Sequence, residues 1–240
     1  MTDTTVTTTT AYPKFETVML ETFPDYQWEA VEATTEDGYE LTFFHLYKDG
    51  VSDDTLPPVF FQHGGMMSAD SWLGNQIDAS SPFFALVDDG HHVYLGNNRG
   101  NEYSQSHESL TWPSAEFYDY DYSGYFEDVA AQTSAMMDNY TGSALGIYIG
   151  FSMGTLQWLG ATSMGALGVA PYNAISQNIQ HAILLAPCTL IEGQGAFGEL
   201  TNLGIYSVPS DDWEVDQATI CDTLGAESAN CGLASYATAD

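Results

Sequence analysis

Two stretches of the sequence place a serine among small residues in a way that supports nucleophilic catalysis. Residues 150–154 read GFSMG and have the form G-x-S-x-G, and residues 161–165 read ATSMG, one methyl group away from that form. A serine in this motif attacks acyl groups when a strand ends abruptly and a helix begins at the serine, because the turn lifts the hydroxyl above the edge of the sheet. The glycines two residues before and two after the serine leave room for the turn.

Only Ser152 has the neighbouring elements that this chemistry requires. The apolar run LGIYI before it predicts a strand, and TLQWLGATSMGA after it predicts a helix. Ser163 follows eleven residues later, about three helical turns, so we expect it inside the same helix, where the small residues around it are typical of close helix–sheet packing. Ser152 is therefore the predicted nucleophile. The alternative is a tight turn in which Ser152 only caps the helix.

Acyl transfer also needs N–H groups that stabilise the oxyanion of the tetrahedral intermediate. Met153 follows the predicted nucleophile at the start of a helix, so its N–H is one candidate donor. The sequence HGG at residues 63–65 follows the apolar strand PPVFF and leaves further N–H groups free at the same edge of the sheet. These two segments together predict an oxyanion hole.

A histidine base, which a serine nucleophile needs together with an orienting acid, is not evident. His181 is the only histidine after the serine, and it precedes a predicted strand, as do His91 and His92. All three are therefore expected at the opposite end of the sheet. His63 and His107 follow strands and lie on the correct side, but His63 is more typical of a structural loop histidine. The sequence predicts that the base and the acid lie outside these 240 residues.

Short apolar runs alternate with helical patterns around these motifs. The runs VFFQ, HVYL, GIYIG and AILLA are apolar on both faces, which suits a buried parallel sheet. Helical patterns cover residues 81–90 and 123–142, and Asp-Gly at residues 37–38 predicts a hairpin between two earlier strands. The pattern predicts an α/β domain with three layers and a mainly parallel sheet.

Charge and composition exclude several classes of partner. Three basic residues against thirty-three acidic ones give a net charge of −30, which argues against nucleic acid or an anionic membrane surface as partner. Such a charge suits an acidic compartment, a salty medium or a basic partner, and a solvated surface that only confers solubility is the alternative. No apolar run approaches the roughly 20 residues of a membrane span, and the N-terminus lacks the features of a signal peptide.

Five segments occur in the order and rough spacing of the acid lipase family: FFQHGGMMSADSWLGN, LVDDGHHVYLGNNRGN, EFYDYDYSGYFEDVAA, IYIGFSMGT and ILLAPC. The chain resembles these gastric and lysosomal lipases, which have the α/β-hydrolase fold with helices on both faces of the sheet. The resemblance implies a hydrolase of neutral lipid esters, such as triacylglycerols or sterol esters, that needs no metal or organic cofactor. It matches Ser152 to the nucleophile and Gly65 and Met153 to the oxyanion-hole donors. The family generally has His and Gln around the serine, where this chain has Phe151 and Met153.

The resemblance also implies a division of the chain and a missing part. Residues 1–17 would be a flexible Thr-rich tail, 18–190 the α/β-hydrolase core and 191–240 a partial cap, with the C-terminal part of the sheet absent. A C-terminal fragment or partner chain would then complete the sheet and the catalytic triad. The alternative is a non-catalytic lipase-like subunit with a role in assembly.

Three cysteines and one glycosylation sequon give indications of the cellular compartment in which the protein is located. Because acid lipases carry a disulfide-forming cluster in the cap, we expect Cys221 to pair with Cys231 and Cys188 to be free, with three inert thiols as the alternative. Asn139 begins the sequon N-Y-T and is the expected glycosylation site. Both features favour a secreted or lysosome-like acidic location.

Overall fold

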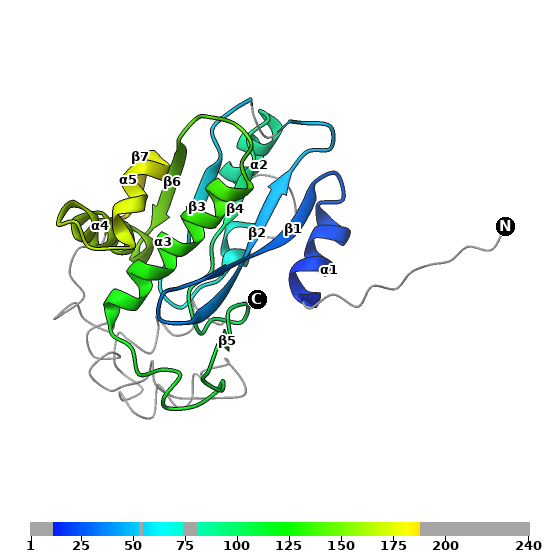
Figure 1. Ribbon diagram of the computed structural model, residues 1–240. Helices are drawn as coiled ribbons and strands as arrows, with labels where there is room; N and C mark the ends of the chain where they lie inside the picture. Colours follow the sequence, from blue (N-terminus) through cyan, green and yellow to red (C-terminus); the bar gives the residue numbers. More distant parts are fainter. Residues whose placement is uncertain (1–11, 53–54, 74–80, 188–240) are drawn as a thin grey trace, which may run out of the picture.

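The structure is a computed structural model that describes residues 12–52, 55–73 and 81–187 (Figure 1). Its strands are β1 (Gln27–Thr34), β2 (Tyr39–Tyr47), β3 (Val59–Gln62), β4 (Val93–Leu95), β5 (Ser106–His107), β6 (Gly146–Phe151) and β7 (Ile179–Leu185). Its helices are α1 (Pro13–Thr22), α2 (Pro82–Asp88), α3 (Tyr122–Asn139), α4 (Met153–Ala166) and α5 (Ile175–Asn178), with short 3-10 helices η1 (Ala69–Leu73) and η2 (Tyr172–Ala174).

The strands form one mixed sheet in the order β1-β2-β4-β3-β6-β7, with β5 paired to β2. The hairpin β1–β2 is antiparallel and turns at Gly38, whose φ of 97° is readily available only to glycine. Strand β3 pairs in parallel with β4 and with β6, and β6 pairs in parallel with β7. The carboxyl ends of β3, β4 and β6 therefore meet at one edge of the sheet, which is the edge that the sequence motifs require.

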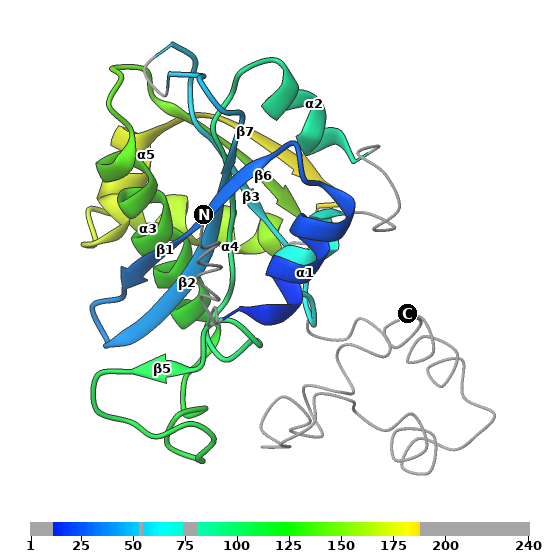
Figure 2. The same cartoon turned by 90° about the vertical axis from the view of Figure 1, so that its right-hand side faces the viewer.

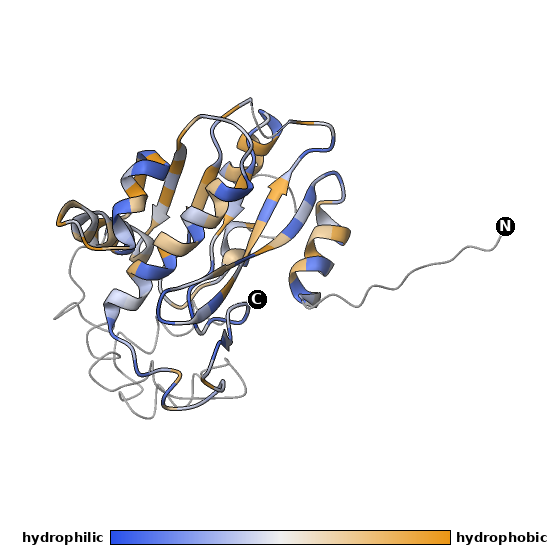
Figure 3. Cartoon of the chain, in the orientation of Figure 1, coloured by the Kyte–Doolittle hydropathy of each residue, from blue (hydrophilic) through white to orange (hydrophobic). Residues whose placement is uncertain are grey.

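Successive side chains of the central strands point to opposite faces of the sheet, and helices cover both faces. One face packs against α1 and α2 and includes Phe44 and Phe61, whereas the other packs against α3, α4 and α5 and includes Phe43 and Phe60. Figure 2 shows these two groups of helices on opposite sides of the sheet. Helices α1 and α3 carry both hydrophilic and hydrophobic residues along their length (Figure 3), as expected when one side faces the core. The three-layer α/β prediction is confirmed.

Helix α1 corrects the predicted boundary of the N-terminal tail. We expected residues 1–17 to be flexible, but residues 13–17 form the first half of α1. Phe15 is fully buried, and its ring stacks on Phe44 with the ring centroids 3.8 Å apart. Phe15 and Met19, one helical turn apart, form the buried stripe of a short amphipathic helix that the Thr-rich residues before it obscured. Residues 1–11 lie outside the described residues.

The last strand, β7, pairs with β6, and its side chains Ile183 and Leu185 are 49% and 42% exposed. The predictions of an incomplete sheet, of a cap over residues 191–240 and of a Cys221–Cys231 disulfide concern residues 188–240, which lie outside the described residues. Within the ranges that the structure describes, no helix is long and apolar enough to cross a membrane.

All three basic side chains of the chain join separate elements. Lys14 of α1 pairs with Asp70 of η1 at 3.1 Å, and Lys48 at the end of β2 pairs with Asp88 of α2 at 2.6 Å. Arg99, in the loop after β4, is fully buried and pairs with carboxylates of two other elements. In a chain with so few cations, these contacts offset part of the repulsion among the acidic groups.

Candidate active site

Ser152 lies between the end of β6 and the first residue of α4, and its backbone is strained. Its φ of 50° and ψ of −112° fall outside the regions that residues with a side chain normally adopt. Its side chain makes no capping hydrogen bond to α4, so the alternative of a simple helix-capping serine is not supported. A strained serine on a sharp strand-to-helix turn is the geometry of a nucleophile elbow.

The two glycines of the motif are required by close backbone approaches. A Cβ atom at Gly154 would lie 2.6 Å from the carbonyl oxygen of Gln62, at the end of β3. A Cβ atom at Gly150 would lie 2.8 Å from the carbonyl oxygen of Gly154 itself. Since neither backbone oxygen can move without shifting a strand or helix, only glycine lets the start of α4 pack against the end of β3.

The second serine, Ser163, lies within α4, as predicted, and its hydroxyl donates to the carbonyl oxygen of Leu159 at 2.6 Å. The packing around it differs from the prediction. A Cβ atom at Gly160 would lie 2.3 Å from the ring of Phe126, so α4 packs closely against helix α3 at this point rather than against the sheet. Ser163 has the environment of an ordinary helical serine.

The loop after β3 lies directly beside the elbow. A Cβ atom at Gly64 would be 3.3 Å from the Cβ atom of Ser152, so the loop backbone runs past the serine at contact distance. Met153 is the first residue of α4, and an N–H at this position has no acceptor within its helix. The N–H of Gly65 donates to no acceptor among the described residues. Met153 and the loop that carries Gly65 thus border Ser152 in space, and the role of the two N–H groups as oxyanion donors stays a prediction.

His63 holds this loop in place and is fully buried. Its Nδ1 lies 2.7 Å from the carbonyl oxygen of Gly64, and its Nε2 lies 3.3 Å from the backbone nitrogen of Asn98. A carbonyl oxygen only accepts and a backbone N–H only donates, so Nδ1 carries the proton and Nε2 accepts. In a trans peptide the Gly64 carbonyl and the Gly65 N–H point in opposite directions, so this contact turns the Gly65 N–H away from His63.

His63 is expected to remain neutral, with its proton on Nδ1, until the pH falls to about 4. Burial is the main cause of this lowered pKa, and the bond to the Gly64 carbonyl opposes it. Because the unfolded chain takes up this proton near pH 6.5, the group's contribution to stability is present above pH 6.5 and is lost as the pH falls toward 4. Long-range ¹H–¹⁵N NMR of the ring nitrogens checks both points. A proton on Nε2, or a titration midpoint above pH 6, would contradict the assignment.

His107, the other histidine on the correct side of the sheet, also has both ring nitrogens engaged. Its Nε2 donates to the carbonyl oxygen of Asp37 at 3.0 Å, and its Nδ1 accepts from the backbone N–H groups of Ser109 and Leu110. It closes the loop next to the hairpin turn. His63 and His107 are therefore structural histidines, and neither is free to accept a proton from Ser152.

The remaining four histidines lie away from the elbow. His91 and His92 directly precede β4, and His92 contacts His45 of β2 at 2.8 Å between ring nitrogens. His181 pairs with Ile147 near the start of β6, about 13 Å along the strand from its end. The sequence has six histidines, all within the described residues, and none of them is positioned to act as the base.

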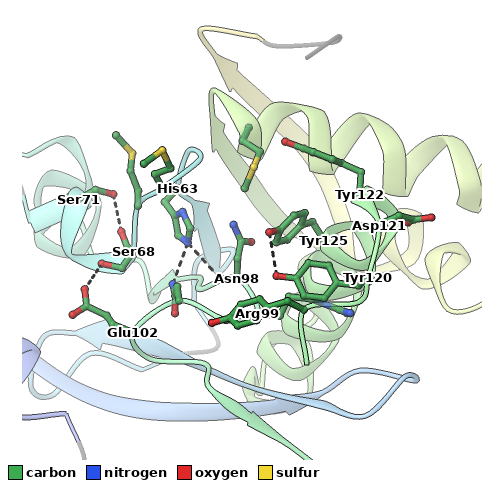
Figure 4. Close-up of a pocket in the computed structure, with 16 residues that line it drawn as sticks. His63, Ser68, Ser71, Asn98, Arg99, Glu102, Tyr120, Asp121, Tyr122 and Tyr125 are labelled. Atoms are coloured by element: carbon green, nitrogen blue, oxygen red, sulfur yellow. Dashed lines mark hydrogen bonds between the residues drawn. The ribbon is translucent and has the colours of Figure 1, made fainter. Parts of the chain in front are cut away.

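A cavity of about 700 Å³ opens next to the elbow (Figure 4). Met153 reaches it, whereas Ser152 is half-buried beside it. Its apolar lining includes Met66, Met67 and Met153. Its polar lining comprises His63, Ser68, Ser71, Asn98, Arg99, Asn101, Glu102, Tyr118, Tyr120, Asp121, Tyr122 and Tyr125. In size the cavity fits a small-molecule ligand.

A buried ion pair lies beneath this cavity, and the sequence patterns did not predict it. Arg99 donates from Nε to Asp128 at 2.7 Å and from Nη1 to Asp37 at 2.6 Å, and its guanidinium group lies 4.0 Å from the ring centroid of Tyr39. Burial raises the pKa of Asp128 to about 6, although Arg99 opposes the shift. One signal could have drawn attention to it: Arg99 is the only arginine of the chain. The spacing of the apolar residues places Asp128 on the opposite side of the predicted helix, so the helical pattern gave no sign of its burial.

Asn139 is the last residue of α3, and it is exposed, which matches the place expected for the sequon. Its Nδ2 donates to the carbonyl oxygen of Ala135 at 2.8 Å. Its glycosylation stays a prediction.

Among the described residues, no group of three or more His, Cys, Asp or Glu side chains could hold a metal ion.

A mainly parallel sheet that delivers a strained serine to the start of a helix defines the chain as an α/β hydrolase. The family model for the α/β-hydrolase fold matches residues 57–216, and that for the partial α/β-hydrolase lipase region matches residues 19–76. The chain belongs to the α/β-hydrolase fold family.

Curated relatives confirm the resemblance to acid lipases. The chain is 31% identical to a putative lysosomal acid lipase/cholesteryl ester hydrolase of Crotalus adamanteus, over 76% of this chain and 44% of the relative. It is 28% identical to the gastric triacylglycerol lipase of Mus musculus, over 71% of this chain and 42% of the relative. The chain thus spans less than half the length of these relatives. Oligopeptidase B of Trypanosoma brucei, 16% identical with a TM-score of 0.50 over 74% of this chain and 24% of that one, shows the fold alone.

Proposed function

We propose that the chain is the nucleophile-bearing part of a serine carboxylic-ester hydrolase that acts on neutral lipid esters such as triacylglycerols or sterol esters. Ser152 attacks the ester carbonyl, and the N–H groups of Gly65 and Met153 stabilise the oxyanion. The alcohol leaves, and water then releases the acid from the acyl-enzyme. The observation that carries the proposal is the strained backbone of Ser152 beside the glycine loop.

The charge of the site supports an uncharged substrate. Arg99, the cation on the cavity lining, is already paired with two carboxylates. The lining also holds the carboxylates of Asp121 and Glu102, the second of which is paired with Lys14. An anionic ester would therefore meet repulsion without a free cation to bind it. The names of the curated relatives, which include lysosomal and gastric lipases, are consistent with neutral lipid esters and with a secreted or lysosomal location.

The histidine base and its acid come from a segment outside this chain, either a C-terminal fragment or a partner chain. This part of the proposal rests on two observations. None of the six histidines is positioned to take the proton from Ser152, and the chain spans less than half the length of its relatives. The completing segment would also cover Ile183 and Leu185, whose side chains lie on the same face of β7 and are exposed in the described structure.

Hydrolysis of an emulsified triacylglycerol by the protein isolated from its source, compared with the isolated 240-residue chain, tests the proposal. We expect the native protein to be at least about 100-fold more active than the chain alone, because general-base catalysis contributes roughly 10²–10⁴-fold. Intact mass of the active fraction then identifies the completing segment. Lack of hydrolysis of any neutral ester by the native protein would contradict the proposal and favour a non-catalytic subunit.

A further inference from the structure

A layer of buried amide side chains lies under the cavity floor and is not used by the proposed chemistry. Gln62 at the end of β3, Asn98 after β4 and Gln157 in α4 are each at least 96% buried. The Oδ1 atom of Asn98 accepts from Nε2 of Gln62 at 2.9 Å and from Nε2 of Gln157 at 2.6 Å. Asn98 is the member of this layer that lines the cavity.

A backbone carbonyl fixes the direction of these amides. The Nε2 atom of Gln157 lies 3.4 Å from the carbonyl oxygen of Tyr125, which can only accept a hydrogen bond, so this atom is the nitrogen. Its other contact, 2.6 Å away on Asn98, must then be the oxygen. Asn98 therefore keeps its nitrogen, Nδ2, for a different direction.

The Nδ2 group of Asn98 is a donor without an acceptor. No described residue accepts a hydrogen bond from it, and in Figure 4 the Asn98 side chain lies between those of His63 and Tyr125, which also line the cavity. This atom is not buried from solvent, because Asn98 lines the cavity, so a ligand oxygen that enters the cavity can accept a hydrogen bond from it. The two glutamine contacts hold this donor in a fixed position before any ligand arrives.

We propose that Asn98 is a specificity-determining residue that donates a hydrogen bond from Nδ2 to an oxygen of the bound ester other than the reacting carbonyl. The substrates favoured are esters whose alcohol or acyl chain carries a hydroxyl or ether oxygen, such as a partial glyceride. Apolar parts of the same molecule contact Met66, Met67 and Met153. The inference rests on the proposed function, because it concerns substrate choice at that site.

Binding to a Ser152→Ala protein tests the inference without requiring hydrolysis. Ligand-observed NMR gives Kd for two pairs of esters that exchange oxygen for carbon. The oxygen in each pair is an ether oxygen, which can only accept a hydrogen bond and cannot donate to the carboxylate that Asn98→Asp introduces. 2-Methoxyethyl butyrate against butyl butyrate tests the alcohol side, and propyl methoxyacetate against propyl butyrate tests the acyl side. Asn98→Asp, added to Ser152→Ala, keeps the Oδ1 acceptor for the glutamines and replaces the donor with an oxygen. Asn173→Asp, on the exposed 3-10 helix η2, is the matched control.

We expect Asn98→Asp at pH 7 to weaken binding of the oxygen-bearing ester of one pair by about 3- to 10-fold, the size of one hydrogen bond, and to leave its carbon analogue unchanged. The pair that responds shows whether the acyl or the alcohol chain occupies the cavity. Equal effects on both members of each pair, or no effect on any, would overturn the inference.

A second measurement applies if Asn98→Asp does not fold. In the Ser152→Ala protein, the ¹⁵N side-chain resonance of Asn98 should shift on addition of the oxygen-bearing ester and not its carbon analogue. Equal shifts, or none, count against the inference. Hydrolysis by the native protein is measured separately, so a retained binding preference without hydrolysis would contradict only the proposed function.

Discussion

In the native protein, the substitution Ser152→Ala is expected to lower kcat for ester hydrolysis by at least about 10⁴-fold, because loss of the proposed nucleophile removes the acyl-enzyme route. The fold should survive the change. The strained backbone at Ser152 is imposed by the close contacts of Gly150 and Gly154, and its hydroxyl makes no capping bond to α4. Initial rates on a soluble butyrate ester, with circular dichroism to confirm folding, give the measurement.

Ser163→Ala is the control for this variant. Ser163 occurs in the same helix and in a near-copy of the same motif, but its hydroxyl bonds only to the carbonyl oxygen of Leu159. The control should keep kcat within about twofold of the wild type, since a surface substitution of this kind changes stability by only about 0.5 kcal/mol. Equal losses in both variants would show that the helix, and not the nucleophile, was affected.

Replacing Arg99 with methionine is expected to lower the free energy of unfolding by about 3–5 kcal/mol, the usual cost of removing one partner of a buried ion pair. The substitution leaves the carboxylate of Asp128 buried without its cation and removes the link between the hairpin turn at Asp37 and helix α3. It also removes the contact of the guanidinium group with the ring of Tyr39. Urea unfolding followed by tryptophan fluorescence at pH 7 gives the free energy.

Lys48→Met provides the comparison for Arg99→Met. Lys48 also pairs with a carboxylate, Asp88 at 2.6 Å, but both side chains are more than a third exposed. Exposed ion pairs contribute about 0–1 kcal/mol, so this variant should unfold close to the wild type. A loss below about 1 kcal/mol for Arg99→Met would contradict the role assigned to the buried pair.

The sheet and the elbow could be predicted from the sequence because their signals are local. The strands at the centre of the sheet are apolar on both faces, as the neighbours Phe60 and Phe61 of β3 show by entering different cores. The turn at Ser152 follows from a strand, a helix and two glycines that lie within one short segment. These signals need no knowledge of distant residues, so the α/β class and the position of the serine followed from them.

The features that were missed depend on contacts between distant residues. Arg99 meets Asp37 and Asp128, which are 62 and 29 residues away in the chain. The amide layer likewise joins residues from β3, the loop after β4 and α4. Helix α1 is stabilised by packing on Phe44, which its own sequence does not indicate. Spacing along the chain could not reveal these partners.

Labelling of the native protein with a fluorophosphonate probe, followed by peptide mass spectrometry, shows whether Ser152 is an activated nucleophile. The probe reports an activated serine and requires neither a chosen lipid nor knowledge of the completing segment. We expect one modified serine, Ser152, in the native protein, unchanged labelling in Ser163→Ala and none in Ser152→Ala. Absence of labelling at Ser152 in the native protein, or labelling of another serine that persists in Ser152→Ala, would contradict this expectation.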